Sequence, residues 1–498
     1  MRATFTTAEI LAATGGTLVQ DGAWNICCGV STDSRTCQAG ELFIPLSGER
    51  HDGHEFIPGA LRRGARGVLV EESWCLRKGA RGRGPHLQSP PDPHSQPLKG
   101  NSRGTASRAH LGLPREVTVI SVPDALAALG DLARAWRDRF QVPVVAITGS
   151  CGKTTTKEMI GAVLSRSYRV LKNRLNLNNL IGVPLTLLGL EGSHEAAVVE
   201  MGMNAFGEIR RLTQIAAPTL GVLTNVHAAH TEGVGDVSGV ARAKGELAAA
   251  LDHGARLVYN ADDPWLASLA GNFPGPALGF GLAPGAGLRA TGRRTLEGLG
   301  QMANLHFQGR SWPLKLSVPG LHMLYNALAA TAVGLSLGLT PKETAAALAQ
   351  FQPIHRRSQV VTLNSGVHLL NDCYNANPGS MAMALKTLNE LRGRGRAAAA
   401  LADMLELGDA AAAEHRELGR VAARSGLDLL VVCGNFRGEV AAGAKEAGLA
   451  PPRLVEVSSR AEGAEVLKEF LQPGDWLLVK GSRSMHMEGL IAALEEEP

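Results

Sequence analysis

Short apolar runs alternate with segments of helical periodicity over the last two thirds of the chain. The runs of the middle third are VPVVAITG (142–149), AAVVEMG (196–202), LGVLTNV (220–226) and ARLVYNAD (255–262). Those of the last third are VHLLNDCYN (367–375), AAAALADM (397–404), LDLLVVCGN (427–435) and DWLLVKGS (475–482). Strands buried on both faces are continuous apolar runs, and their alternation with helices is typical of parallel sheets. We therefore predict two α/β domains, each with a parallel sheet.

The first third of the chain differs from the rest in its sequence pattern and is expected to form a third domain. A length of 498 residues also suggests about three domains, at roughly 100–200 residues each. We place the domains at residues 1–122, 123–352 and 353–498. Because ligands bind beyond the carboxyl ends of the strands in open parallel sheets, the residues that end the apolar runs are the first candidates for chemistry.

Composition limits where such a protein can work. The chain is 45% hydrophobic and 19% charged, which is typical of a globular protein with a large core. No apolar run approaches the ~18 residues that a membrane span needs, and the N-terminus, MRATFTTAEI, lacks the pattern of a secretion signal. The seven cysteines are scattered and form no CxxC pair, so we expect neither a disulfide framework nor a zinc site. The sequence therefore predicts a protein of the reducing cytoplasm without membrane insertion.

Positive charge is concentrated in one segment, residues 76–115. This segment contains eight basic residues and one acid, a net charge of 8 − 1 = +7, whereas the whole chain carries +4. It is rich in Pro, Gly and Ser and has no apolar periodicity, so we expect a flexible insertion. A nucleic-acid-binding arm is the alternative interpretation, but no aromatic residue lies among the charges to stack on bases. We therefore predict no nucleic-acid partner.

Residues 142–159 have the order that a phosphate-binding loop requires: a buried strand, a glycine loop, Lys-Thr and a helix. Gly149 and Gly152 let backbone N–H groups approach phosphate oxygens, and the start of the helix adds a positive potential. Lys153 adds a point charge, and the Thr154 hydroxyl can bind Mg²⁺. The usual loop has four residues between its glycines, whereas this one has two. We expect the loop to hold the triphosphate of a nucleotide.

Polar residues that follow the next runs are candidates for the same site. Glu200 ends the run AAVVEMG, at a position where a carboxylate can hold the metal of the nucleotide. The segment TNVHAAHTEG offers His227 and His230, but imidazole suits transition metals better than Mg²⁺. From residue types alone, these are loop histidines, and Lys244 in ARAKGEL is an exposed helix lysine.

Taken together, the motifs resemble those of the Mur ligases, the ATP-dependent amide-forming enzymes of peptidoglycan assembly. They are TGSCGKTTTKEM, NLNNLIGVPLTLL, VVEMGMN, TNVHAAHTEG and ARAKGEL in the middle third, NDCYNANPGSM, LADMLELGD and VKGSRSM in the last third, and STDSR and FIPLSGERHDGHEF in the first. The short glycine spacing is the form that this family uses. The resemblance covers nearly the whole chain except residues ~75–115, and it is strongest to the branch that joins D-alanyl-D-alanine to a UDP-N-acetylmuramoyl tripeptide.

The resemblance implies a fold and an activity. The fold is a small N-terminal α/β domain for the UDP-sugar, a central P-loop domain with a parallel sheet for ATP, and a C-terminal Rossmann-like α/β domain for further ligands. The activity is an ATP-dependent amide ligation through an acyl phosphate, with ATP and Mg²⁺ as cofactors. The UDP-N-acetylmuramoyl tripeptide and D-alanyl-D-alanine are the expected partners, and the family suggests a monomer.

The resemblance also assigns roles to residues of the central domain. Thr154 and Glu200 are assigned as ligands of the Mg²⁺ that binds with ATP, and His230 as a ligand of a second Mg²⁺. Lys244 takes the position of a carbamylated lysine, which is also a metal ligand. The expected catalytic residues are Lys153, Glu200, His230 and Lys244. Asn326 takes the position that contacts adenine, although Met323 stands where Asn is expected. The loop residues that would bind ATP are Gly149, Ser150, Cys151, Gly152, Lys153, Thr154 and Thr155.

Further residues are assigned to ATP or to the other substrates by the same resemblance. Arg357 would reach a phosphate, with Arg356 as the alternative, and Asp372 would face the ribose. The expected substrate-binding residues are Asp33, Ser34 and Arg35 for the uridine diphosphate, Asn178 and Asn179 beside the loop, and Asn375 and Asn377 for the dipeptide.

Two other functions stay open at this point. The first is another ligase of the superfamily, which adds a diamino acid or glutamate; Gly379 after NANP, in place of an arginine, argues against the diamino-acid enzyme. The second is a P-loop regulatory switch or a nucleic-acid-associated ATPase that uses the basic segment, which leaves the C-terminal motifs unexplained. The sequence does not distinguish lysine from diaminopimelate as the third residue of the peptide substrate.

Overall fold

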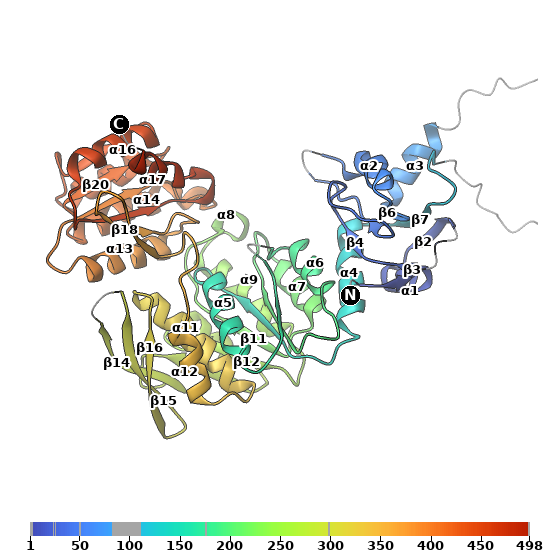
Figure 1. Cartoon of the computed structure of the whole chain (residues 1–498), viewed down its shortest axis with the longest axis horizontal. Coiled ribbons are helices and arrows are strands. Elements are labelled where there is room, and N and C mark those ends of the chain that lie inside the picture. The colour runs from blue at the N-terminus through green and yellow to red at the C-terminus, as the bar shows by residue number, and fades with distance from the viewer. Residues whose placement is uncertain are drawn as a thin grey trace, which may run out of the picture. The chain divides into compact units, whose positions relative to one another are not determined.

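The computed structural model describes residues 3–22, 24, 26–48, 51–81, 111–174, 177–296 and 299–496 (Figure 1). The contacts within the chain divide it into two units, Met1–Gln141 with Leu180–Gly192, and Val142–Asn179 with Ser193–Pro498. Most of the expected basic insertion, residues 82–110, lies outside the described residues. No helix in the described part of the chain is long and apolar enough to cross a membrane.

The first unit is built on a five-stranded sheet with the strand order β2-β7-β6-β5-β4. Strand β2 runs antiparallel to β7, and the other neighbours are parallel. Buried Phe43, Val68 and Val119 belong to its core. The elements of this unit are β1 (Phe5–Thr6), α1 (Thr7–Thr14), β2 (Thr17–Gln20), β3 (Ile26–Cys27), β4 (Val30–Ser31), β5 (Leu42–Phe43), η1 (Gly53–Phe56), α2 (Ile57–Arg62), β6 (Gly67–Glu71), α3 (Glu72–Arg81), β7 (Thr118–Val122), α4 (Ala125–Arg137) and α6 (Gly182–Leu187).

The second unit contains two sheets, of which the first has nine strands in the order β16-β15-β14-β13-β12-β11-β8-β10-β9. From β9 to β14 all neighbours are parallel, and β14, β15 and β16 form an antiparallel extension (Figure 1). Its elements are β8 (Val144–Thr148), α5 (Lys153–Leu164), β9 (Val170–Lys172), β10 (Ala196–Glu200), α7 (Glu208–Ala216), β11 (Leu220–Leu223), α8 (Thr231–Val234), α9 (Val237–Ala249), β12 (Arg256–Asn260), α10 (Pro264–Gly271), β13 (Ala277–Gly281), β14 (Leu288–Thr295), β15 (Gln301–Phe307), β16 (Arg310–Leu316), α11 (Leu321–Ser336) and α12 (Pro341–Ala349).

The order of this sheet places β8 at a topological switch point. Strand β10 pairs with one side of β8 and β11 with the other, so the loops that follow β8, β10 and β11 leave the same edge of the sheet in different directions. Such a point is where open parallel sheets bind ligands. Helices α5 and α11 cover one face of the sheet and share a core with it, which includes Met159, Val163 and Leu328.

The second sheet of this unit has six strands in the order β17-β18-β22-β19-β20-β21, parallel except for β17. Separate cores line its two faces, one against α13, α14 and α15 and one against α16 and α17. Its elements are β17 (Gln359–Thr362), β18 (His368–Asn371), α13 (Pro378–Arg392), β19 (Ala397–Leu401), η2 (Gly408–Ala410), α14 (Ala411–Arg424), β20 (Leu429–Val432), α15 (Arg437–Glu446), β21 (Leu454–Glu456), α16 (Arg460–Phe470), β22 (Trp476–Lys480), η3 (Arg483–Met485) and α17 (Glu488–Glu495).

Local capping explains where several helices of the second unit begin. Asp236, Asp263 and Asn377 are N-caps of α9, α10 and α13, and each side chain accepts a hydrogen bond from a backbone N–H of the first turn. These residue types satisfy donors that a helix start leaves free, and proline directly after the cap is pre-organised for the helix. Pro264 and Pro378 occupy that position.

The structure confirms the predicted fold class. Each of the eight apolar runs contains a strand of a largely parallel sheet, and the first third of the chain forms a smaller α/β unit. The antiparallel extension β14–β16 was not anticipated. The domain boundaries at 122 and 352 stay predictions.

Candidate active site

The loop between β8 and α5 depends on its two glycines. Gly149 and Gly152 have φ angles of 154° and 78°, in a region that other residues adopt only with strain. A Cβ at Gly149 would lie 1.9 Å from Thr224 Oγ1, and one at Gly152 would lie 2.6 Å from Asn326 Oδ1. The backbone of the loop therefore approaches its neighbours more closely than a side chain would permit.

Residues that follow β11 hold the first half of this loop. Asn225 accepts hydrogen bonds from Ser150 N at its backbone oxygen (3.0 Å) and from Cys151 N at Oδ1 (2.8 Å). Ser150 Oγ in turn donates to the backbone oxygen of His227. Burial lowers the pKa of His227, so the imidazole is neutral near pH 7.

The second half of the loop presents free donors. The N–H groups of residues 152–155 make no hydrogen bond to another residue in the described chain, and the helix ladder begins with Thr156 N donating to Gly152 O at 2.8 Å. Free N–H groups at a helix start attract anions, and the helix dipole adds to this. This arrangement fits a phosphate group.

Lys153 adds a charge to the same end of α5. Its Nζ donates to Gly149 O at 2.8 Å, so the side chain folds back over the loop. Burial lowers the pKa of Lys153, although the nearby carboxylate of Glu200 opposes that shift. Among the described residues no carboxylate forms an ion pair with this half-buried ammonium, so its charge is available to an anionic ligand.

Glu200, at the end of β10, is fixed by several hydrogen bonds. Thr154 Oγ1 donates to its Oε2, and Asn178 Nδ2 donates to its Oε1, both at 2.8 Å. Asn173 bonds both the N–H and the C=O of Glu200 through its amide, and only 2% of the residue is exposed. The predicted pair Thr154 and Glu200 thus lies together, with Asn178 beside it.

His230 directly precedes α8, and Lys244 lies on the next helix, α9. His230 has a φ angle of 58°, and its Nδ1 lies 2.7 Å from Oε2 of Glu406, which itself has a φ angle of 64°. The hydrogen bond from His230 lowers the pKa of Glu406, and the charge of Lys153 adds to this. Glu406 follows β19, so a residue of the C-terminal sheet faces the predicted metal ligand.

Lys244 is not the exposed helix lysine that residue type alone predicted. It lies on α9 and is only 1% exposed. In the described structure its ammonium has no hydrogen-bond partner. Burial, and after it the charge of Lys153, lower the pKa of Lys244 well below its usual value, so this amine near the phosphate-binding loop loses its proton more readily than that of an exposed lysine.

Asn326, on α11, contacts the start of α5. Its Oδ1 accepts a hydrogen bond from Thr156 Oγ1 at 3.2 Å, and its Nδ2 points to the sulfur of Met323 at 3.8 Å. Met323 is 2% exposed and belongs to the core. The methionine at this position therefore offers Asn326 only a weak acceptor.

The two candidate arginines of the C-terminal part differ in their partners. Arg356 Nη1 forms an ion pair with Glu488 Oε1 at 2.8 Å. The guanidinium of Arg357 lies 4.0 Å from the ring centre of Tyr374, and within the described structure it has no carboxylate partner. Its charge acts on the pKa of Lys153, and Arg357 as the phosphate contact stays a prediction.

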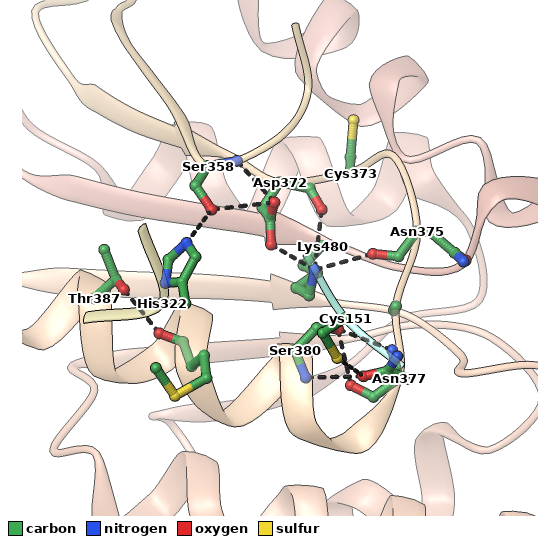
Figure 2. A network of polar contacts seen from close by, with 12 residues as sticks. Cys151, His322, Ser358, Asp372, Cys373, Asn375, Asn377, Ser380, Thr387 and Lys480 are labelled. Carbon is green, nitrogen blue, oxygen red and sulfur yellow. Dashed lines mark hydrogen bonds and ion pairs between the residues drawn. The ribbon is translucent and has the colours of Figure 1, made fainter. Parts of the chain in front are cut away.

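The segment that follows β18 carries the other predicted residues of this part (Figure 2). Asp372 Oδ1 accepts a hydrogen bond from Ser358 N at 2.7 Å, and Asp372 Oδ2 forms an ion pair with Lys480. Asn377 Oδ1 accepts from Ser380 N at 2.9 Å and from Cys151 Sγ at 3.0 Å, and its Nδ2 donates to Ser150 O at 3.4 Å. Asn377 therefore joins α13 to the phosphate-binding loop.

The residues predicted for uridine diphosphate lie in a turn after β4 of the first unit. Arg35 forms a two-point ion pair with Asp33, with Nη2 to Oδ2 at 2.8 Å, and lowers the pKa of this carboxyl. Arg35 N also donates to Asp33 Oδ1, and Ser34 stands between the two residues. The arginine side chain is 86% exposed, which leaves its outer donors accessible to a ligand.

Several residues of the site were not predicted. Asn173, Glu406 and Lys480 are polar residues at or near strand ends, and that position was the available signal. Glu200 was found by the same signal because it stands beside the loop motif. Within the described residues, no group of three or more His, Cys, Asp or Glu side chains could hold a metal ion alone.

Three family descriptions match parts of the chain. They are "Mur ligase family, catalytic domain" at residues 28–85, "Mur ligase middle domain" at 147–334 and "Mur ligase, glutamate ligase domain" at 356–483. The UDP-N-acetylmuramoyl-tripeptide–D-alanyl-D-alanine ligase of Bacillus subtilis is 34% identical over 470 residues, which cover 94% of this chain and 93% of the relative.

Solved structures give the same picture. MurF from Acinetobacter baumannii matches with a TM-score of 0.84 and 30% identity, over 100% of both chains. The MurF ligase of Thermotoga maritima, in complex with ADP, matches with a TM-score of 0.77 and 27% identity, over 94% of this chain and 96% of that one.

Proposed function

The chain belongs to the Mur ligase family, and from this premise we propose that it joins D-alanyl-D-alanine to a UDP-N-acetylmuramoyl tripeptide in an ATP-dependent reaction. The observation that carries this proposal is similarity over nearly the full length to relatives named for that reaction. The T. maritima relative was solved with ADP, and the loop of residues 149–155 has the free donors that bind such a phosphate chain. The confirmed fold class agrees with the domain order of these relatives.

The chemistry explains the need for ATP. A carboxylate does not condense with an amine in water, because its oxygen is a poor leaving group. Transfer of the γ-phosphoryl group of ATP to the carboxylate of the tripeptide gives an acyl phosphate and ADP. The amine of the dipeptide then attacks the carbonyl carbon, loses a proton, and phosphate leaves with the electron pair of the broken C–O bond.

The residues of the loop would stabilise this charge transfer. The N–H groups of residues 152–155 and the ammonium of Lys153 are held in place before the reaction, by α5 and by the hydrogen bond to Gly149 O. Preorganised donors of this kind act through positioning and electrostatics, and loss of one typically raises the barrier by about 3–4 kcal/mol.

Thr154 and Glu200 fit Mg²⁺ as ligands. Their oxygens lie 2.8 Å apart, and hydroxyl and carboxylate oxygens together with phosphate and water are the usual surroundings of this ion. When bound, Mg²⁺ supplies Lewis-acid stabilisation of charge on the phosphoryl group. His230 and Lys244 are proposed for a second ion.

Lys244 suits this role only after carbamylation. Its buried amine, once deprotonated, can add CO₂ and release a proton, which gives an anionic oxygen ligand in place of a cation. The lowered pKa supports this step, because a protonated amine has no lone pair to form the bond.

The remaining substrate contacts follow from the positions of the predicted residues. Asp33, Ser34 and Arg35 would bind the uridine diphosphate, with the guanidinium fork on phosphate. Arg357 and Asp372 would contact ATP, Asn326 its adenine, and the substrate-binding set would be completed by Asn178, Asn179, Asn375 and Asn377. The domains would span residues 1–122, 123–352 and 353–498, and the enzyme would act as a cytoplasmic monomer, as the family resemblance implies.

Gly379 favours the dipeptide-adding reaction over the diamino-acid one. It follows Pro378 at the start of α13, and a Cβ at this position would lie 2.7 Å from the ring of His227. An arginine there would displace the ring of His227, whose backbone N and O bond Ser150 of the phosphate-binding loop.

Phosphate release tests the proposal. With ATP and Mg²⁺, the chain should release phosphate only when the UDP-muramoyl tripeptide and D-alanyl-D-alanine are both present. Glutamate, lysine and diaminopimelate serve as competing amines, with either the tripeptide or the shorter UDP-muramoyl peptides as acceptor. Release that needs neither substrate, or release with a single amino acid in place of the dipeptide, would overturn it.

A further inference from the structure

Lys480 is a buried cation at the end of the central strand of the C-terminal sheet. It is the last residue of β22, which lies between β18 and β19, and only 2% of it is exposed. Strands β18 and β19 lie on opposite sides of β22. Lys480 therefore lies at the switch point of this sheet, where open parallel folds bind ligands.

The ammonium of Lys480 holds two points of one segment, residues 372–377 (Figure 2). It forms an ion pair with Asp372 Oδ2 and donates to the backbone oxygen of Asn375 at 2.9 Å. A lysine ammonium has three donors and bonds without directional restriction. The two contacts therefore set the course of the chain between β18 and α13.

From this segment, contacts extend to both nucleotide-binding elements of the central sheet. Asp372 accepts from Ser358 N, and Ser358 Oγ lies 3.0 Å from Nε2 of His322 on α11. At the other end, Asn377 bonds Cys151 and Ser150 of the phosphate-binding loop. The segment is thus linked through Ser358 to α11, which carries Asn326, and it contacts the phosphate-binding loop directly.

Fold stability alone does not account for a lysine at this place. A buried ion pair contributes little net stability, because the desolvation of the two charges offsets their attraction, and an apolar side chain of similar size often serves as well. The three residues of β22 before it, Leu477, Leu478 and Val479, are apolar and buried, as this sheet requires. The ammonium supplies something that a methionine would not, namely simultaneous hydrogen bonds to Asp372 and Asn375.

We propose that Lys480 is a positioning residue of the ligase: it fixes residues 372–377 so that Asp372 faces the nucleotide while Asn377 holds the phosphate-binding loop. Because the same segment carries the residues proposed for the dipeptide, Lys480 couples the sites for ATP and dipeptide. The role in dipeptide binding rests on the proposed function, whereas the role in nucleotide binding does not.

Two variants of the full chain test this role. Lys480→Met removes both contacts, and Lys445→Met, at an exposed lysine of α15 that pairs with Glu456, is the matched control. For K480M we expect the Kd for Mg–ADP, measured by titration calorimetry, to rise on the order of tenfold. The KM for the dipeptide should rise by a similar factor, the size typical of a residue that orients a ligand-binding group. The control should match the parent in both.

The comparison of KM with Vmax separates positioning from folding. A variant that is only less stable has fewer active molecules, which lowers Vmax and leaves KM and Kd unchanged. A displaced segment raises both constants. If folded K480M keeps the parental KM for the dipeptide and the parental Kd for Mg–ADP, the proposal is overturned. A loss confined to Vmax would overturn it as well.

A second variant decides the matter if K480M does not fold. Lys480→Arg keeps the charge beside Asp372, but its larger planar head cannot occupy the place of an ammonium without moving the Asn375 carbonyl. We expect K480R to fold and to raise the dipeptide KM and the ADP Kd at least threefold. Unchanged constants would overturn the proposal. If the parent itself needs no dipeptide for phosphate release, the proposed function fails, and the ADP titration still tests Lys480.

Discussion

The surroundings of Lys244 make it a chemical group of a different kind from a surface lysine. It is buried on α9, its ammonium has no partner in the described chain, and its pKa lies well below the usual value because of burial. We expect Lys244→Ala to reduce turnover at least tenfold, because a carbamate oxygen near the phosphate site would be lost, at the cost typical of a lost electrostatic contact. Added short-chain carboxylic acids should restore part of the rate, since they can enter the space of the missing side chain and supply the oxygens.

The rate of phosphate release with and without acetate or propionate measures this effect. Lys445→Ala, at an exposed position, is the control, and the acids should not change its rate. Intact-protein mass spectrometry of the parent under added CO₂ gives a second readout, a gain of one CO₂ that the alanine variant lacks. Parental activity of the alanine variant would remove Lys244 from the site.

His322 gives a pH dependence that can be isolated. Burial lowers its pKa to about 4 from the usual 6.5, although the charge of Asp372 opposes this. Below about pH 6.5 the unfolded imidazole binds a proton that the folded one does not. The contribution to stability is therefore complete above that pH and is lost as the pH falls toward 4, at no more than about 1.4 kcal/mol per pH unit.

Urea denaturation at several pH values between 7 and 4.5 measures this loss. The parent should lose stability with falling pH more steeply than His322→Gln, in which the group cannot titrate. His253→Gln, at an exposed position, should follow the parent. Equal slopes for the parent and the His322 variant would show that the folded protein protonates this imidazole as readily as the unfolded chain does.

Strands that form a continuous apolar run could be predicted from the sequence, and strands with a broken hydrophobic pattern could not. Strands β8, β10 and β11 are buried along their whole length, β12 is mostly buried, and all four appear as apolar runs. Strand β14, LRATGRRT, buries Leu288 and Ala290 and exposes much of the rest. Its pattern is broken by Gly292 and by three arginines, so a search for apolar runs passes over this antiparallel extension.

Asn377 shows how one side chain can serve an element and a site together. Its Oδ1 accepts from Ser380 N and caps α13, while its Nδ2 donates to Ser150 O. We expect Asn377→Ala to lower the free energy of unfolding by about 1 kcal/mol through loss of the cap. The same change should also reduce turnover, because the contact with the phosphate-binding loop disappears.

Asn377→Asp separates these two effects. Aspartate keeps an oxygen for the cap and suits the positive end of a helix, but it cannot donate to Ser150 O. The stability measured by denaturation should return to the parental value, whereas kcat/KM should stay low. Parental kcat/KM in the aspartate variant would show that the amide donor is not needed.

At the scale of the whole molecule, a local motif predicted part of the site, and pairings between distant segments supplied the rest. Residues 149–155 and Glu200 could be found because a strand, a glycine loop and a helix follow one another in sequence. The contact of Cys151 with Asn377 joins residues 226 positions apart, and Lys480 meets Asp372 across 108 positions. Neither pair has a pattern of its own, because each partner is placed by a different strand.

The division of the chain into two units predicts separate responses to two ligands. The phosphate-binding loop belongs to the second unit and the turn with Asp33 and Arg35 to the first. A ligand that binds only the folded form of a unit stabilises that unit, by about 2.7 kcal/mol at 100 times its Kd. In scanning calorimetry we therefore expect two transitions, with Mg–ADP raising the temperature of one and UDP that of the other.

Two variants assign the transitions in that experiment. Lys153→Ala should abolish the shift caused by Mg–ADP and keep the shift caused by UDP, because the lost ammonium belongs to the second unit. Arg35→Ala should do the reverse, since its side chain is 86% exposed and its loss removes a phosphate contact without disturbing a core. A single transition that both ligands raise would contradict the prediction, because the two units would then unfold as one cooperative body.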